Sequence, residues 1–121
     1  MLFKKQSPGV EGERRADKYL RGRGYEILAR NQKVGGVEID LLARKDNTLC
    51  LVEVKTRVSD AYGAPEEFVD SRKQRRLIRA GKLLLERKAH RDSLLRFDIV
   101  SVILSHGKAE INHIEGAFEE G

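Results

Sequence analysis

The chain has 121 residues, of which 40% are hydrophobic and 36% are charged. This length supports one modest hydrophobic core, so we expect a single domain over residues 1–121. Lys and Arg outnumber Asp and Glu by 24 to 19, giving a net charge of +5, which favours a polyanionic partner or serves solubility alone. One cysteine excludes an internal disulfide, and no apolar run reaches the ~18 residues of a membrane span. Since Met1–Lys5 lacks the pattern of a signal peptide, we expect a cytoplasmic protein without membrane association.

The first predicted element is a helix. Ser7 and Pro8 form a helix-start pattern, with Ser7 as the N-cap and Pro8 as the first helical residue. We expect the helix to run from about Pro8 to Arg21 and to end at Gly22. Glu13 falls on the otherwise apolar inward face of this helix. Two interpretations stay open: its carboxylate reaches solvent at the edge of the core, or it points toward the charged strands that follow.

Three strands are expected next, and the second and third form a hairpin. Tyr25–Arg30 predicts a short strand, and Asn31–Gly36 predicts a flexible approach to the hairpin. Within Gly35–Arg57, apolar runs lie on either side of Lys45–Thr48, a polar stretch that is typical of a tight turn. A turn at this place fixes which residues of the two strands lie opposite one another.

The expected register brings four charged residues to one face of the hairpin. Asp40 should face Glu53, and Glu38 should face Lys55. Because side chains alternate between the two faces of a strand, the opposite face should be apolar and consist of Val37, Ile39, Leu41, Cys50, Val52 and Val54.

The facing carboxylates of Asp40 and Glu53 predict a metal site. Like charges directly opposite one another repel, and a divalent cation between them would turn that repulsion into binding. Carboxylate oxygens, completed by water and a substrate phosphate, suit Mg²⁺ or Mn²⁺. The alternative is an exposed strand face on which the cations of Arg44, Lys55 and Arg57 neutralise the acids. The basic helix that follows favours the metal site.

After a polar connector, a long helix is predicted over about Glu66–Lys88. Its inward face is apolar except for Lys73, and Gln74 lies beside that face. The helix also carries a run of six cations without an acid among them: Arg72, Lys73, Arg75, Arg76, Arg79 and Lys82. Such a run is either a solvated face or a phosphate-binding one, since each phosphate contact releases a counterion.

The remaining chain predicts a linker at Ala89–Ser93 and strands at Leu95–Ile103 and Ile111–Ile114. The order of helix, three strands, helix and two strands predicts an α/β domain with a mixed β-sheet flanked by helices. The three histidines are scattered, so neither a zinc site nor a Ser-His-Asp triad is supported. The sequence also lacks the glycine loops that bind phosphates in Rossmann and P-loop proteins.

Several of these residues resemble the motifs of known nucleases. Glu13, Glu38-Ile39-Asp40 and Glu53-Val54-Lys55 resemble the PD-(D/E)XK nuclease pattern, which has an acid on the first helix, an Asp at a strand end and an acid-x-Lys on the next strand. A closer resemblance, to the YraN family of small bacterial proteins, covers nearly the whole chain. It is carried by Gly12-Glu13-x-x-Ala16, Gly24-Tyr25, Ala29-Arg30-Asn31, Glu38-Ile39-Asp40-Leu41, Val52 to Arg57 and Arg96-Phe97-Asp98. The YraN family is similar to archaeal Holliday-junction resolvases.

The resemblance implies a restriction-endonuclease-like, three-layer fold and a metal-dependent nuclease. The implied ligands of Mg²⁺ or Mn²⁺ are Asp40, Glu53 and the carbonyl of Val54, with Glu13 helping directly or through water. Lys55 would position the attacking water and stabilise developing negative charge, because nearby carboxylates favour its charged form. Lys73 or Gln74 would touch phosphate.

Together these observations predict a metal-dependent nuclease acting on nucleic acid, with DNA, and branched or flapped DNA in particular, as the expected substrate. Two alternatives stay open, since fold does not fix function: a nucleic-acid-binding module that no longer cuts, or an interaction subunit that needs a partner. In the first two cases the cations from Arg72 to Arg79 would contact phosphates. Resolvases cut as dimers, so the resemblance also leaves a homodimer open.

Overall fold

The computed structural model of the protein describes residues 7–59 and 68–120. The elements in these ranges are α1 (Pro8–Gly22), β1 (Glu26–Val34), β2 (Val37–Lys45), β3 (Thr48–Val58), α2 (Ser71–Leu85), the short 3-10 helix η1 (Lys88–His90), β4 (Leu94–Ser105) and β5 (Lys108–Phe118). The five described strands form one sheet in the order β1-β2-β3-β4-β5, in which β3 and β4 are parallel and the other neighbours antiparallel. The predicted mixed sheet is therefore confirmed, and the parallel pair is joined by the crossover that contains α2.

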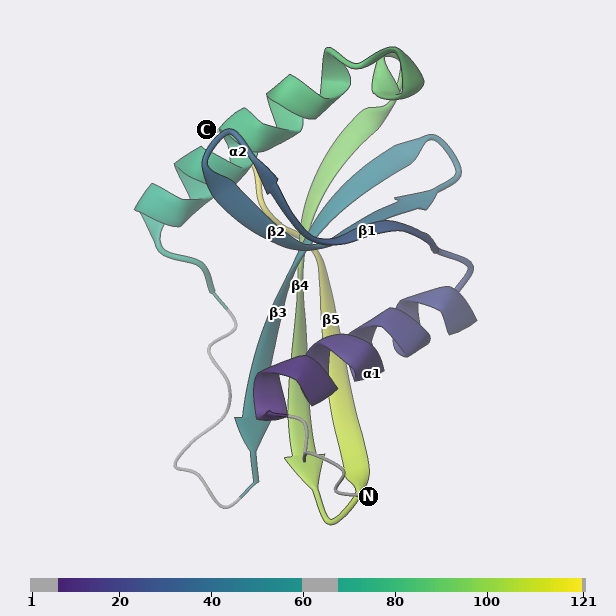
Figure 1. Ribbon diagram of the computed structural model, residues 1–121, viewed down its shortest axis with the longest axis vertical. Helices are drawn as coiled ribbons and strands as arrows, with labels where there is room; N and C mark the ends of the chain where they lie inside the picture. Colours follow the sequence, from purple (N-terminus) through teal and green to yellow (C-terminus); the bar gives the residue numbers. More distant parts are fainter. Residues whose placement is uncertain (1–6, 60–67, 121) are drawn as a thin grey trace, which may run out of the picture.

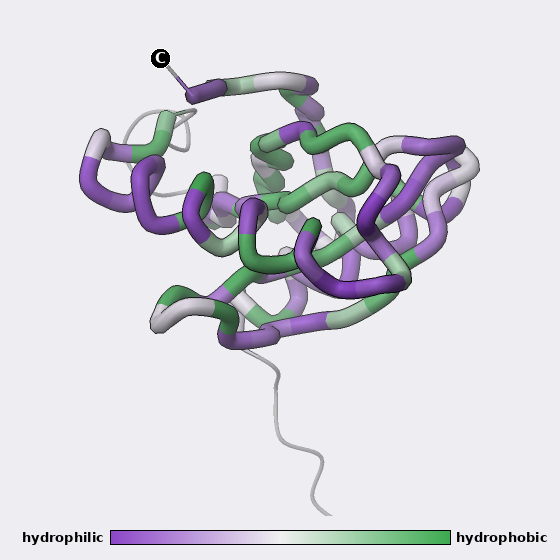
Figure 2. The backbone as a smooth tube through the Cα atoms, turned by 90° about the horizontal axis from the view of Figure 1, so that it is seen from above, coloured by the Kyte–Doolittle hydropathy of each residue, from purple (hydrophilic) through white to green (hydrophobic). Residues whose placement is uncertain are grey.

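The sheet separates two hydrophobic cores, one beneath each helix (Figure 1). Leu51 of β3 packs in one core with Leu84 of α2, whereas the next residue, Val52, packs in the other core with Leu20 of α1. This alternation is typical of a strand that is buried on both faces. Hydrophobic and hydrophilic segments are interleaved along the chain in Figure 2, as expected for elements that bury one side. The three layers confirm the predicted α/β architecture, which is consistent with a restriction-endonuclease-like fold.

The start of α1 forms the predicted cap. The Ser7 side chain accepts a hydrogen bond from the backbone N–H of Val10 (3.3 Å), and Pro8 occupies the first turn. Four residues further on, Gly12 lies directly against β3, because a Cβ at this position would be only 1.9 Å from Oγ1 of Thr56. A residue without a side chain at position 12 therefore lets α1 approach β3 closely.

The expected flexible approach at Asn31–Gly36 is wrong, because β1 continues to Val34 and pairs with β2. Only Gly35 and Gly36 form the turn, with φ of 60° and 82°, a conformation that glycine adopts without strain. Figure 1 shows this turn, in dark blue, beside α2. A Cβ on Gly35 would be 2.8 Å from Cδ1 of Leu83, so the tip of the hairpin is packed against that helix.

The turn and register of the central hairpin are confirmed from the turn as far as the pair Leu41↔Val52. Along the described part of the chain, β2 and β3 form no pair beyond this point. β2 continues to pair with β1, where Glu38 lies opposite Lys33. The prediction that Glu38 faces Lys55 is therefore wrong, because the two strands have already separated.

This separation also changes which side of the sheet the first residues of β2 occupy. Val37 and Ile39 belong to the core beneath α2, whereas Leu41 belongs to the core beneath α1. The prediction that these three residues share one face is wrong, because strict alternation holds only while β2 runs along β3. Asp40 lies at the place where β2 changes course.

α2 is shorter than predicted. Asp70 is its N-cap, has extended dihedral angles and accepts a hydrogen bond from the N–H of Lys73 (2.9 Å), so the helix begins at Ser71. It ends at Leu85, and Lys88 already belongs to η1; residues 60–67, with most of the predicted connector, lie outside the described residues. The predicted inward residues are confirmed as buried: Val69, Leu77, Ala80 and Leu84. Within residues 7–59 and 68–120, no helix is long and apolar enough to cross a membrane.

The last two strands are both longer than predicted. β4 covers Leu94–Ser105, and β5 covers Lys108–Phe118, although only Ile111–Ile114 was expected in the sheet. β5 is the last strand in the order and pairs only with β4. An edge strand of this kind tolerates polar side chains, which weaken the apolar signal in the sequence.

Candidate active site

Asp40 and Glu53 come together where β2 leaves β3. The Asp40 carboxylate takes the place of a backbone partner, since its Oδ2 accepts a hydrogen bond from the N–H of Val54 (2.8 Å). Glu53 precedes Val54 on β3 and is only 6% exposed. The two carboxyl groups are close enough for each to shift the pKa of the other. The two acids predicted to face one another are therefore adjacent, although the pairing of their strands ends one residue earlier.

The two carboxyl groups differ in their protonation. Burial raises the pKa of Asp40 well above its ordinary value, and the hydrogen bond and negative charge of Glu53 raise it further. Burial also disfavours the anion of Glu53, but the hydrogen bond with Asp40 and the ion pair with Lys73 outweigh burial and lower the pKa of Glu53. The opposite directions of the two shifts mean that a proton on this pair is held by Asp40 in preference to Glu53.

Two lysines supply positive charge beside this pair. Lys73 reaches from the inward side of α2 and forms an ion pair with Oε2 of Glu53. Burial works against the charge of Lys73, but Glu53 and Asp40 outweigh it and raise the pKa of this amine. Lys55 is half-buried on β3, two residues after Glu53, and its charge also lowers the pKa of Glu53. The site thus combines two acids with two ammonium groups.

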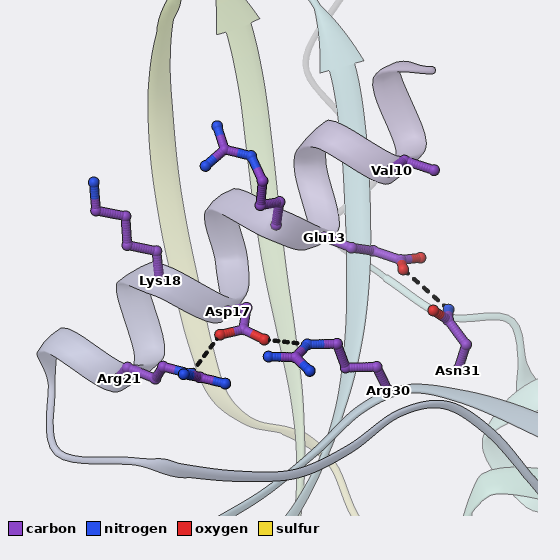
Figure 3. Close-up of a pocket in the computed structure, with 8 residues that line it drawn as sticks. Val10, Glu13, Asp17, Lys18, Arg21, Arg30 and Asn31 are labelled. Atoms are coloured by element: carbon purple, nitrogen blue, oxygen red, sulfur yellow. Dashed lines mark hydrogen bonds and ion pairs between the residues drawn. The ribbon is translucent and has the colours of Figure 1, made fainter. Parts of the chain in front are cut away.

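Glu13 is held beside the site by an amide from β1. Its Oε1 accepts a hydrogen bond from Nδ2 of Asn31 (3.0 Å), as Figure 3 shows, and the same amide donates to Oε1 of Glu38 (3.3 Å). The negative charge of Glu13 contributes to the raised pKa of Asp40, so the two acids share one electrostatic environment. No role of its own was predicted for Asn31. Asn31 has a φ of 50°, which Asn tolerates better than most residues. This preference of Asn is the sequence signal from which a special role at position 31 could have been predicted.

The basic run of α2 lies mostly on the exposed side of the helix. The exposed guanidinium groups belong to Arg72, Arg75, Arg76 and Arg79, and none of them has an ion-pair partner among residues 7–59 and 68–120. Lys82 pairs with Glu120 (2.5 Å). Gln74 donates from Nε2 to the carbonyl of Val69 (2.7 Å), so its side chain fixes the segment that leads into α2.

A comparison with known protein families identifies the family of this chain. The protein-family model described as "Uncharacterised protein family UPF0102" matches residues 12–102 of this sequence, which include Glu13, Asp40, Glu53 and Lys55. The chain belongs to the UPF0102 family. This is the YraN family that the sequence motifs resemble, so the resemblance is confirmed.

Relatives in this family match over nearly their whole length. A UPF0102 protein from Geobacter metallireducens is 41% identical and the match covers 98% of each chain. One from Syntrophomonas wolfei is 44% identical over 91% of this chain and 96% of the relative. One from Persephonella marina is 39% identical over 92% of each chain. The site residues therefore lie in the part of the chain that the family shares.

The donor set of this UPF0102 protein fits a hard divalent cation held by two carboxylates. In the described ranges, no group of three or more acidic, histidine or cysteine side chains is close enough to hold a metal ion. Asp40 and Glu53 form a pair, and the raised pKa of Asp40 indicates that added positive charge is favourable there. Mg²⁺ keeps several waters and often takes only one or two carboxylates. The residues thus fit Mg²⁺ or Mn²⁺ when the ammonium group of Lys73 moves away from the Glu53 carboxylate.

Another buried acid of the UPF0102 protein serves the sheet. Asp98 is 0% exposed and accepts hydrogen bonds from Arg96 (2.9 Å), from the ring of His113 (2.8 Å) and from the N–H of Gly116 (3.0 Å). These contacts join β4 to β5 where the register shifts after Phe97. The Arg96-Phe97-Asp98 motif therefore stabilises the edge of the sheet at this irregular pairing.

Proposed function

We propose that this UPF0102 protein is a metal-dependent nuclease that hydrolyses phosphodiester bonds of DNA, with branched or flapped DNA as its candidate substrates. The observation that carries the proposal is the adjacent pair Asp40 and Glu53 where β2 leaves β3, in which the pKa of Asp40 is raised and that of Glu53 is lowered. Placing two largely buried acids side by side costs stability unless a proton or a cation compensates. Strongly perturbed carboxyl groups of this kind are concentrated at functional sites.

The residues around the pair have distinct roles in this proposal. Asp40, Glu53 and the carbonyl of Val54 would hold the cation, which, when bound, polarises the phosphate and lowers the pKa of water. Lys55, charged beside Glu53, would orient the attacking water and stabilise negative charge that develops on the phosphate. Glu13 would assist at the edge of the site through a water molecule.

Positive charge on α2 would hold the substrate. The exposed cations Arg75, Arg76 and Arg79 follow Lys73 on the same helix, and Lys73 contacts Glu53. Contacts of this kind neutralise phosphates without reading bases. The helix would therefore bring the DNA backbone next to the acids, independently of base sequence.

A cleavage assay with matched variants tests the proposal. Purified protein is incubated with linear, nicked, flapped and four-way DNA in Mg²⁺, Mn²⁺ or EDTA, and products are resolved on denaturing gels. We expect metal-dependent cleavage of at least one substrate, reduced by at least about 10²-fold in Asp40→Asn and Glu53→Gln. Asp46→Asn is the matched control, because Asp46 is exposed in the hairpin turn with a φ of 53° that Asn tolerates. Intact substrates with both metals would refute cleavage of these four DNA structures.

One contact favours a second function, nucleic-acid binding without cleavage. The ammonium group of Lys73 already supplies positive charge to Glu53, as a resident cation would. This function predicts salt-sensitive DNA binding that survives Asp40→Asn and weakens when Arg75, Arg76 and Arg79 are replaced with Gln. Cleavage by the wild-type protein that Asp40→Asn abolishes would exclude this second function.

A further inference from the structure

The groove between α1 and β1 lies next to Glu13 and has a volume of about 520 Å³ (Figure 3). Among residues 7–59 and 68–120, its lining contains the cations Arg14, Lys18, Arg21 and Arg30 and the acids Glu13 and Asp17. These described lining residues have a formal net charge of +2, and one of their cations, Arg14, is also paired with Glu11 (2.7 Å). These cations lie on α1 and β1, and none of them belongs to the basic run of α2.

One buried carboxylate holds two arginines side by side in this groove, as Figure 3 shows. Asp17 pairs through Oδ1 with Nε of Arg21 (2.7 Å) and through Oδ2 with Nε of Arg30 (2.5 Å). Arg21 lies one turn further along α1, whereas Arg30 comes from β1. One arginine from β1 would suffice to tie the strand to the helix. The second arginine, Arg21, leaves surplus positive charge, and the carboxylate of Asp17 fixes the position of that charge.

We propose that this groove binds a single strand of nucleic acid, with phosphates on Arg21 and Arg30 and with the strand continuing toward Glu13. The planar guanidinium group matches two oxygens of a phosphate, which makes arginine well suited to such a contact. A volume of about 520 Å³ is that of a site for a drug-sized ligand, comparable to roughly one or two nucleotides. A volume of this size does not admit a whole duplex, which is wider than its own major groove of about 12 Å.

The lining also determines how the strand would be recognised. Sequence-tolerant single-strand sites often stack bases on aromatic side chains, but none of the lining residues within the described ranges 7–59 and 68–120 is aromatic. Contact through phosphates alone predicts similar affinities for oligothymidylate and oligoadenylate and a marked dependence on salt. The inference rests on the proposed function only for the role of Glu13, and it assigns DNA with an unpaired arm as the substrate class.

Binding in EDTA tests the groove without any cleavage step. The anisotropy of a fluorescein-labelled oligothymidylate is followed at several salt concentrations for the wild-type protein and for Asp17→Asn/Arg21→Gln/Arg30→Gln. This variant removes the buried carboxylate together with both of its partners, so no buried charge is left alone. Losing two phosphate contacts should reduce the salt slope by about 1.4, at about 0.7 per contact, and weaken binding about tenfold. Arg91→Gln, which removes the same net charge from an exposed position outside the groove, should leave both quantities unchanged.

A second measurement keeps the test valid if the triple variant is unstable. Amide shifts of the wild-type protein are recorded by two-dimensional NMR during titration with unlabelled oligothymidylate. We expect shifts at Lys18, Arg21, Arg30 and Asn31. Shifts confined to α2, or equal salt slopes for the triple variant and Arg91→Gln, would overturn the inference. Because both assays contain EDTA, metal-dependent cleavage can still hold when the groove fails, and the groove can bind when cleavage is absent.

Discussion

Replacing Gly12 with alanine tests how closely α1 lies against β3, and with it the position of Glu13. The added Cβ would be 1.9 Å from Oγ1, 2.7 Å from Cγ2 and 2.8 Å from Cβ of Thr56. Ordinary contact begins near 3.4 Å, so helix and strand would have to separate locally by the difference of about 1.5 Å. Rotation of the Thr56 side chain does not relieve the clash with its Cβ.

The expected cost follows from two opposing effects. Alanine favours a helix over glycine by about 1 kcal/mol, whereas extra atoms forced into a packed interface cost about 1–3 kcal/mol and occasionally more. Three close contacts place Gly12→Ala at the upper end of that range, so we expect a net loss of about 2 kcal/mol in the free energy of unfolding. Gly9→Ala is the matched control, because nothing lies within 4 Å of its added Cβ and only the helix preference should change.

Urea unfolding followed by circular dichroism measures these differences. Thr56→Ala removes two of the three clashing atoms, so Gly12→Ala/Thr56→Ala should recover about 1 kcal/mol relative to the sum of the single changes. A Gly12→Ala protein as stable as Gly9→Ala would refute the close approach of α1 to β3. Strict additivity of the two changes would refute the role of Thr56.

Other expected outcomes concern the buried charges and the basic helix. Burial works against the Asp98 anion, but its partners outweigh burial and lower its pKa. Asp98 therefore adds stability above its unfolded pKa of about 3.9, and this stability is lost as pH falls below that value. Asp98→Asn should cost about 3 kcal/mol near neutral pH and should lack this acid dependence in thermal melts; an unchanged profile would contradict the buried network. Lys73→Gln should lower the melting temperature in EDTA more than the exposed control Lys88→Gln, because Glu53 loses its ion pair. Mn²⁺ should reduce this difference in melting temperature. Equal melting temperatures of the two variants would argue against the ion pair of Lys73 with Glu53. The third change replaces Arg75, Arg76 and Arg79 of α2 with neutral residues. It should lower the salt slope of duplex DNA binding by about 2.7, and an unchanged slope would exclude that face as the duplex site.

Local signals in the sequence predicted the central hairpin, and tertiary packing decided where the prediction ended. The polar turn at Lys45–Thr48 is encoded by neighbouring residues, so the register is right as far as Leu41↔Val52. Beyond that pair β2 leaves β3, and its turn with β1 packs against α2, a contact with a distant part of the chain that local signals do not encode. For the same reason the sides occupied by Val37 and Ile39 were mispredicted.

In the candidate site too, local signals predicted part of the arrangement, and packing between distant parts of the chain determined the rest. Register alone brought Asp40 and Glu53 together, because both lie within a residue of the confirmed pairing. The ion pair of Lys73 depends on how α2 docks on the sheet, and helix periodicity placed this lysine inward without naming its partner. The length of α2 was overestimated because the Asp70 cap resembles an ordinary acid in a first turn.

The most direct test of the central claim is a titration of Mn²⁺ into the protein, with free Mn²⁺ measured by electron paramagnetic resonance. The claim is that Asp40 and Glu53 form a cation site. Wild-type protein and Asp46→Asn should bind Mn²⁺ saturably, and the site should disappear in Asp40→Asn. Equal binding by wild-type protein and Asp40→Asn, or no saturable binding by either, would contradict the claim.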